Sequence, residues 1–523
     1  MSANKENKKR IIYMEHTEQH IVAIDLGTSK IALVVVKVNG DDVQVVYYRE
    51  TASAGILNRG VTNMVNASIP LQHLIKDAEE SLNIKINQAI IGMPKFPIRQ
   101  EANSGKIEDR GEFTEITQEN VEDLKRFAQD SYPLPSTVKE AIYGAVAQSF
   151  SDGENFQIKE EDIVGMSSDV LEGHFKIFIG KRKELMNADA LLTKVGISAI
   201  KKYFTADTTA RVILSETEMD NGVALVDFGG GSTSVTIYHD GILRHYASIP
   251  FGGKSITHDI KSELQITERL AENIKMAFGA CMPEKLLNMS EKVLHIMDKT
   301  TAQDKQVTVK YLSEIVTARV EEIMEAVLYE IQESGLAEHL RCGIVITGGA
   351  AQTANLGLLI NEMSGYKVRI GYPRTDISDY DIDGTHEPSA TTILGLVTAA
   401  IKDGVPTCAV DNDIPYQETF TTPEPVYIEP DYTETEVEYV PEAEEMNEEY
   451  TEYEAEEEET EVVAAETEII QTPQTEQEQP AEKEEKWKFL KVVWGKAQTI
   501  GANINKMIDG ITVEEDDTEE FGS

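Results

Sequence analysis

Two segments of the chain repeat one pattern roughly two hundred residues apart: IVAIDLGTSKIALVV (21–35) and VALVDFGGGSTSVTIY (223–238). Each is an apolar strand that ends in an aspartate, followed by a glycine-containing turn with hydroxyl side chains and a second apolar strand. Glycine lets the backbone approach a phosphate chain closely, and the free N–H groups of such a turn can bind anionic oxygens. Two such turns, one domain length apart, indicate two related domains that hold one nucleotide between them.

A third segment, GIVITGGAAQTANL (343–356), combines a buried strand, a Gly-Gly turn and the start of a helix. Its turn offers backbone N–H groups without side-chain bulk, which suits close packing against a flat purine and its ribose.

The order D-x-G-T, D-x-G-G-G-S and I-T-G-G-A is similar to the phosphate, phosphate and adenosine motifs of the actin-like ATPase superfamily. Within it the chain resembles the FtsA family of bacterial division proteins over roughly residues 21–400, including SITHDIKSELQITERLAENIKMAFG (255–279). IVGMS (163–167) is similar to a motif of the small subdomain that FtsA inserts into its first domain. The resemblance implies an α/β actin-like fold, with two duplicated mixed sheets flanked by helices and an inserted subdomain.

The resemblance implies ATP or ADP with Mg²⁺ as the ligand. Asp25 and Asp227 end the two strands and are expected to hold Mg²⁺ through water, since Mg²⁺ prefers oxygen ligands and keeps several waters. Glu272 and Lys275 lie one helical turn apart, so both can face the nucleoside; an exposed charge pair is the structural alternative. The residues expected to bind nucleotide are Asp25, Gly27, Thr28, Ser29, Lys30, Asp227, Gly229, Gly230, Gly231, Ser232, Thr233, Glu272, Lys275, Gly348, Gly349 and Ala350.

The resemblance also bears on hydrolysis. MreB-type ATPases orient the attacking water with a glutamate just after the crossover between domains, whereas this chain has YFTADTTARV (203–212) there, with Asp207 out of register. Slow or negligible hydrolysis is therefore expected, with ATP as a structural ligand and the catalytic residue left open.

Other proteins of this fold are alternatives. A chaperone would need a folded peptide-binding domain after about residue 400, and a sugar kinase would need a substrate pocket that contains a base. A PilM-like pilus-assembly protein is the nearer alternative.

Charge is unevenly distributed along the chain. The formal net charge is −44, and residues 403–482, which contain neither Lys nor Arg, supply 27 of these negative charges. Such a balance repels nucleic acid, so none is expected as a partner. Three cysteines without a C-x-x-C pair fit a reducing cytoplasm, and no secretory signal or long apolar span is found.

The acidic region 406–484 has too little apolar area to offset the entropy of ordering, which predicts a disordered spacer; an acidic docking motif is the alternative.

Beyond the spacer, residues 485–511 place apolar side chains at helical spacing on one face and lysines on the other flank. The spacer separates this segment from the domains, so the apolar face needs another apolar phase. Lysines and tryptophans in this pattern favour a helix that lies in an anionic membrane surface, as the C-terminal helix of FtsA does. The predicted membrane residues are Trp487, Leu490, Val493, Trp494, Ala497, Ile500, Ile504, Met507 and Ile508, with Lys488, Lys491 and Lys496.

Together these features predict a protein at the cytoplasmic side of the cell membrane, at the division site. By resemblance it self-assembles into polymers, attaches the FtsZ ring to the membrane and helps recruit other division proteins. The predicted boundaries are a disordered lead (1–20), a first domain (21–85 and 184–214) with its insert (86–183), a second domain (215–254 and 337–405) with an upper subdomain (255–336), the spacer (406–484), the helix (485–511) and an acidic tail (512–523).

Overall fold

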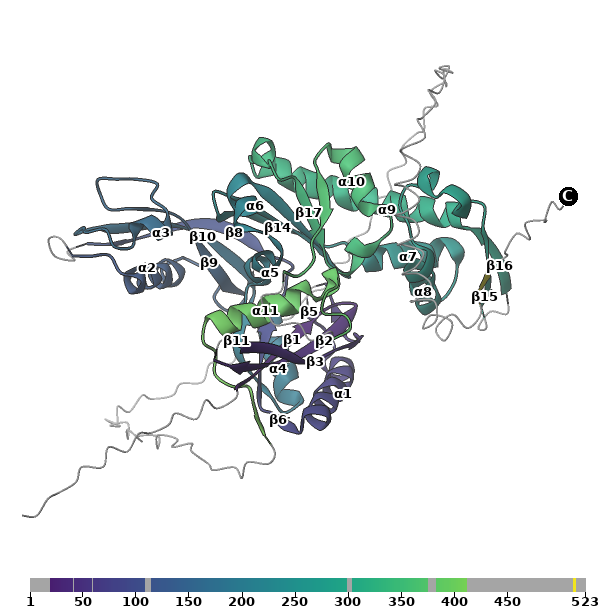
Figure 1. Ribbon diagram of the computed structural model, residues 1–523, viewed down its shortest axis with the longest axis horizontal. Coiled ribbons are helices and arrows are strands. Elements are labelled where there is room, and N and C mark those ends of the chain that lie inside the picture. The colour runs from purple at the N-terminus through teal and green to yellow at the C-terminus, as the bar shows by residue number, and fades with distance from the viewer. Residues whose placement is uncertain are drawn as a thin grey trace, which may run out of the picture. The chain divides into compact units, whose positions relative to one another are not determined.

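The computed structural model describes residues 19–411, except 41, 59, 109–113, 299–302 and 375–381, together with residues 511–513. The first domain is built on a five-stranded sheet in the order β11-β7-β1-β2-β3, in which β1, β2 and β3 are antiparallel and β7 and β11 run parallel to β1 (Figure 1). Its strands are β1 (Gln19–Leu26), β2 (Lys30–Asn39), β3 (Asp42–Ala52), β7 (Gln88–Gly92) and β11 (Ser198–Tyr203). Two smaller pairs accompany them, β4 (Ile56–Leu57) with β5 (Gly60–Val61) and β6 (Ile84–Ile86) with β19 (Ala409–Asp411).

Three helices pack on the first sheet: α1 (Met64–Leu82), α4 (Arg182–Lys194) and α11 (Thr391–Lys402). The run Ile21–Ile24 is buried on both sides of β1, as expected for a strand covered on both faces. One hydrophobic core joins these strands to all three helices.

The second domain repeats this arrangement in a sheet of order β14-β13-β12-β17-β18. Alternate residues of β12 point to opposite faces, so Val226 and Phe228 share a core with the upper helices, whereas Val223 and Leu225 pack against residues of α5. The strands are β12 (Val223–Phe228), β13 (Thr233–His239), β14 (Ile242–Ile249), β17 (Ile344–Thr347) and β18 (Val368–Ile370). The helices are α5 (Thr205–Ile213), α6 (Glu216–Asn221), α7 (Gly253–Leu264), α8 (Glu268–Phe278), α9 (Val309–Glu333) and α10 (Leu356–Ser364), with short 3-10 turns η1 (Pro283–Lys285), η2 (Leu287–Met289), η3 (Ala337–His339), η4 (Gly349–Gln352) and η5 (Pro388–Ala390).

The inserted subdomain is a three-stranded antiparallel sheet, β8 (Arg99–Ile107), β10 (Leu171–Lys181) and β9 (Glu140–Ser151), with α2 (Gln118–Asp130) and α3 (Glu160–Ile163). Thr117 caps α2, because its hydroxyl accepts a hydrogen bond from the Asn120 amide at 3.3 Å. The subdomain has a small core of its own, and its strand β9 also packs beside β14 of the second domain.

A second small sheet joins β15 (Val293–Asp298), β16 (Gln303–Thr308) and β20 (Ile511–Val513) in antiparallel pairs. Ile511, predicted as the last residue of the C-terminal helix, and Thr512, predicted to be in solvent, therefore belong to a strand paired with β15. Val513 belongs to the same strand. Residues 485–510 and 514–523 of the two predicted segments lie outside the described residues, as do residues 412–484 of the predicted spacer.

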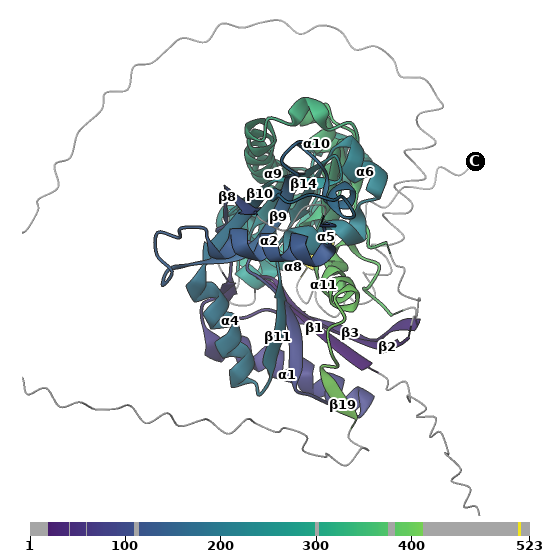
Figure 2. The ribbon, with the colours of Figure 1, turned by 90° about the vertical axis from the view of Figure 1, so that its left-hand side faces the viewer.

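Several of the predicted boundaries need correction. β1 begins at Gln19, inside the predicted disordered lead (1–20), and β10 ends at Lys181, so the insert ends before residue 183. α5, predicted in the first domain (184–214), contributes to the core against the second sheet. β7 lies inside the first sheet, so the insert begins at β8 rather than at residue 86. α11 packs in the first domain's core, whereas the sequence predicts it in the second domain, because its place after β18 in the chain does not show which sheet it packs on (Figure 2). Residues 409–411, assigned to the spacer, form β19 against β6.

In the part of the chain that the structure describes, no helix is long and apolar enough to cross a membrane. The three cysteines, Cys281, Cys342 and Cys408, are free, as their spacing predicts.

Candidate functional site

The two glycine-containing turns predicted from the sequence lie against each other. The first turn joins β1 to β2 and the second joins β12 to β13. A Cβ added to Gly231 would lie 2.6 Å from the Thr28 hydroxyl oxygen, and one added to Gly230 would collide with the Ser29 hydroxyl. The turns are therefore in contact although some two hundred residues separate them, and only glycine fits on the second-domain side.

A third layer of backbone covers the second turn. The amides of Gly253 and Lys254, at the start of α7, donate to the carbonyls of Gly229 and Gly230 at 2.9 and 2.8 Å. Gly348 has a φ of +89°, and a Cβ there would lie 2.5 Å from Asp227 Oδ1. The Gly-Gly turn thus lies directly against the second aspartate, and the structure brings all three predicted motifs together.

The two predicted aspartates face a shared region of charge. Asp25 pairs with Ala32 across the β1–β2 hairpin, and Asp227 lies near the end of β12 and is 7% exposed. Burial raises the pKa of Asp25. The positive charges of Lys95 and Lys30 act to lower that pKa, whereas the Asp227 carboxylate raises it further. Because the pKa of Asp25 responds to Asp227, the two carboxyl groups act on each other electrostatically.

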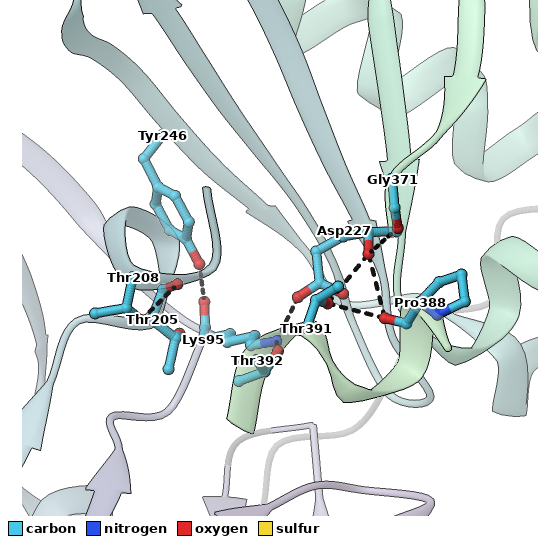
Figure 3. A network of polar contacts seen from close by, with 10 residues as sticks. Lys95, Thr205, Thr208, Asp227, Tyr246, Gly371, Pro388, Thr391 and Thr392 are labelled. Atoms are coloured by element: carbon cyan, nitrogen blue, oxygen red, sulfur yellow. Dashed lines mark hydrogen bonds and ion pairs between the residues drawn. The ribbon is translucent and has the colours of Figure 1, made fainter. Parts of the chain in front are cut away.

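Lys95 was missed by the sequence reasoning. Its ammonium forms an ion pair with Asp227 and donates a hydrogen bond to the Thr392 hydroxyl at 3.0 Å (Figure 3). Burial lowers the pKa of Lys95, but Asp227 and Asp25 outweigh it and hold that pKa above its ordinary value. The lysine is therefore a fixed positive charge between the two aspartates. No glycine motif marks it, since it lies in the loop between β7 and β8.

The predicted phosphate-binding side chains differ in their surroundings. Ser29 is exposed, and Gly27, Thr28 and Gly229 to Ser232 are half-buried. A Cβ on Gly27 would lie 2.6 Å from the Lys30 carbonyl oxygen, so the first turn also requires glycine. Lys30 is paired with Glu50. Thr233 is fully buried, and its hydroxyl donates to the Phe251 carbonyl at 2.9 Å, so this side chain is hydrogen-bonded within the protein.

The predicted nucleoside pair lies on α8 beside the start of α7. Lys275 Nζ is 2.8 Å from Glu272 Oε2, and it also donates to the Gly253 carbonyl at 3.1 Å and the Thr257 hydroxyl at 2.9 Å. Burial lowers the pKa of Lys275, which Glu272 partly offsets. Ala350 lies nearby, 3.3 Å from a Cβ position on Gly253. Lys275 thus joins the pair to the start of α7, while the Glu272 side chain is 38% exposed.

A magnesium ion fits this donor set through its waters. Within the ranges that the structure describes, no group of three or more His, Cys, Asp or Glu side chains is placed to hold a metal directly. Two carboxylates and a turn of free amides instead suit a hydrated Mg²⁺ bound to phosphate oxygens. The twelve predicted membrane residues of the C-terminal segment lie outside the described residues.

Comparisons with known proteins agree with this architecture. Residues 224–395 match the family model described as cell division protein FtsA. The chain is 30% identical to the cell division protein FtsA of Neisseria meningitidis over 74% of its own length and 92% of the relative's. It is 26% identical to that of Escherichia coli, over 72% and 89%.

Among solved structures, the chain is similar to one of the PilM-PilN type IV pilus biogenesis complex, with a TM-score of 0.52 and 11% identity over 73% of this chain and 98% of the other. At that identity the likeness shows the fold alone, which is the actin-like fold expected from the sequence. The relatives go further: by sequence, over nearly their whole length, this chain belongs to the FtsA family of cell division proteins.

Proposed function

We propose that the chain binds ATP or ADP with Mg²⁺ between its two domains. The observation that carries this proposal is the contact between the two glycine turns, with Asp25 and Asp227 beside them. The turns would bind the phosphates, the aspartates would position hydrated Mg²⁺, and Glu272, Lys275, Gly349 and Ala350 would face the nucleoside. Each group would then meet the part of the ligand that its chemistry suits.

Hydrolysis is proposed to be slow or negligible. Asp207, the carboxylate nearest to the crossover in sequence, accepts hydrogen bonds from the Tyr238 hydroxyl at 2.7 Å and from Arg211 Nε at 2.8 Å. Both of its oxygens are therefore engaged within the fold. ATP would act as a ligand that stabilises one arrangement of the domains.

Calorimetric titration tests nucleotide binding. Replacing Asp227 by alanine removes the carboxylate that would hold the metal, so Mg-ATP affinity should fall by at least about tenfold. Asp130→Ala, at an exposed aspartate of the insert, is the matched control and should bind as the unsubstituted chain does. Equal affinity of the Asp227→Ala and Asp130→Ala proteins would contradict the site.

For the cellular role, we propose that the chain self-assembles and attaches FtsZ polymers to the membrane, and that it recruits other division proteins. Family membership and the lysine- and tryptophan-containing pattern of residues 485–511 support this. The FtsZ tail is proposed to contact the upper subdomain (255–336). Arg319 there is already held by Asp259, at 3.0 Å from Nη2 to Oδ1, so other basic residues such as Lys261 and Arg269 would have to meet an acidic peptide.

Flotation with anionic vesicles tests the membrane proposal. A truncated protein ending at Glu482 lacks the predicted helix and should stay in the dense fraction, while the full chain should float with the lipid. Trp494→Glu in the full chain should behave like the truncated protein, because a charge on the apolar face opposes burial. If the truncated protein floats as well as the full chain, the segment is not a membrane anchor.

A further inference from the structure

Lys95 occupies a position in the site that the three glycine motifs leave unexplained. Its ammonium contacts Asp227 of the second domain and Thr392 of α11, which packs in the first domain's core. Asp25 of the first domain is close enough to influence its pKa. One cation therefore links groups from both domains at the point where the two turns meet.

The orientation of Asp227 shows which end of the site Lys95 faces. Oδ1 of Asp227 lies toward Gly348, in the turn expected to face the nucleoside, while Oδ2 is bound by Lys95. The two oxygens of one carboxylate thus point to different neighbours. Lys95 lies on the side of Asp227 away from the nucleoside residues, where the far end of a phosphate chain would be.

A small cavity adjoins Lys95 and Asp227. It is lined by Lys95, Thr205, Ala206, Thr209, Leu225, Asp227, Ser234 and Thr236. Thr209 is 3% exposed, and its hydroxyl has no hydrogen-bond partner within the described part of the chain. A buried hydroxyl without a partner is costly, so a bound oxygen in the cavity would satisfy it. The orphaned hydroxyl is a second, independent sign that polar ligand atoms belong there.

The backbone of Lys95 is held in place. The Tyr246 hydroxyl, on β14, donates to the Lys95 carbonyl at 2.8 Å (Figure 3). Two residues earlier, the amide of Met93 donates to the Tyr203 carbonyl at 2.9 Å. Tyr246 in turn packs edge-on against Phe178 and Phe204. The loop therefore presents the ammonium from a fixed point, as a preorganised ligand contact requires.

We propose that Lys95 binds the terminal phosphate of the nucleotide and makes the site prefer the triphosphate to the diphosphate. This inference rests on the proposed nucleotide function. On binding, the ammonium would move from Asp227 toward the γ-phosphate oxygens, and the aspartate would turn to the waters of Mg²⁺. A phosphate group carries more negative charge than a carboxylate, which favours the exchange.

A purely structural role for Lys95, as the counter-ion of Asp227, predicts a different result. Loss of a counter-ion would disturb the aspartate and its metal whichever nucleotide is bound, so ATP and ADP affinities would fall together. Loss of a γ-phosphate contact would weaken ATP binding and leave ADP binding nearly unchanged. The ratio of the two affinities separates the two roles.

The experiment is calorimetric titration of the full chain with Mg-ATP and with Mg-ADP. Lys95→Gln keeps a donor for Asp227 and Thr392 but removes the charge, and it should weaken ATP binding by about tenfold and ADP binding by no more than about twofold. Lys95→Arg retains the charge and should keep the ratio near that of the unsubstituted chain. Lys85→Met, which removes an exposed lysine paired with Glu79, is the matched control and should change neither affinity.

Near-identical losses for ATP and ADP, or no loss for either, would overturn the assignment. Thermal unfolding without nucleotide shows whether each variant is folded. If the Lys95→Gln protein is unfolded, the Lys95→Arg protein decides: should it fold and lose the preference for ATP, the assignment of Lys95 is overturned. If the unsubstituted chain binds neither nucleotide, the proposed function itself fails. That result is distinct from a failure of Lys95 alone.

Discussion

His245 lies where three parts of the chain meet. On β14, its Nδ1 is 2.8 Å from the Gln100 side chain of the insert, and its Nε2 is 3.4 Å from Glu330 of α9. Lys176 of β10 is also close enough to act on it. Burial lowers the pKa of His245, and Glu330 only partly reverses the shift. The neutral imidazole therefore suits this junction.

The sign of this shift predicts acid sensitivity. The folded pKa lies below the ordinary 6.5, so His245 does not affect stability well above pH 6.5, where it is neutral in both states. As the pH falls below 6.5, the unfolded chain binds a proton that the folded chain does not, and stability falls by up to about 1.4 kcal/mol per pH unit until the folded pKa is reached.

Thermal unfolding at pH 7.5 and pH 5.5 checks this prediction. The unsubstituted chain should lose more stability on acidification than the His245→Gln chain, which carries no titrating ring at this position. Other groups titrate in both proteins and cancel in the comparison. Equal losses in the two proteins would show that His245 does not contribute.

At the site, sequence patterns predict those residues whose role depends on the conformation of their own turn. Gly27, Gly230 and Gly231 could be predicted because a turn without room for Cβ leaves a glycine signature in the sequence. Lys95 could not, because its role comes from contact with Asp227, 132 residues away, and a lysine in a loop looks like any solvated lysine. Nor could the internal pairing of Lys30 with Glu50, which requires knowing that β2 lies beside β3.

Helices α5 and α11 cross at a point that has no room for a side chain. A Cβ on Gly395 of α11 would lie 2.5 Å from the Thr208 carbonyl oxygen of α5. The helices therefore pack backbone to backbone at this point. α5 also contributes to the core against the second sheet, whereas α11 belongs to the core of the first.

Gly395→Ala should therefore lower stability by about 1–3 kcal/mol, because an added methyl group must push one helix away from the other. Gly357→Ala in α10 is the matched control, since its Cβ would make only ordinary van der Waals contacts, at 3.7 Å from Val368 and 4.0 Å from Ile346. There the better helix propensity of alanine should make the change neutral or favourable, by about 0.5–1 kcal/mol. Thermal unfolding of both proteins measures the difference; a stabilised Gly395→Ala protein would contradict the close packing.

Element type was predictable from the sequence, but not always the domain that an element joins. Local sequence is enough to predict the strands β1 and β12 from their apolar runs and the start of α2 from its cap at Thr117. β7 and α11 are different: each is identifiable as a strand or helix, yet its neighbours are set by long-range packing. The sequence of α11 shows that a helix forms there but not which sheet it packs on.

For the whole molecule, charge distribution sets an expectation for membrane binding. The predicted spacer carries most of the excess negative charge, and the proposed anchor follows it. A spacer sets how far an anchor can reach and not how tightly it binds. Its removal should therefore leave vesicle binding intact.

Deleting residues 423–480 from the full chain should give the same flotation with anionic vesicles. Replacing Lys488, Lys491 and Lys496 together by glutamine should weaken flotation, since each lysine contributes about 1 kcal/mol near an anionic surface, and the loss should be clearer at low salt. Loss of flotation on deleting the acidic region would show that this region itself contributes to the lipid contact.

The placement of Lys95 also limits how the insert could be exchanged for another. The loop that carries it runs directly from β7 of the first sheet into β8 of the insert, and Gln100 follows as a contact of β14. A graft made after Gly92 would take a site residue away with the subdomain, whereas one made beyond Pro97 would leave it behind. At the other end, β10 ends at Lys181 and α4 begins at Arg182, far in sequence from any predicted ligand residue. The exit of the inserted subdomain can thus be cut without affecting the site, whereas at its entrance the cut must fall beyond Pro97 if Lys95 is to stay.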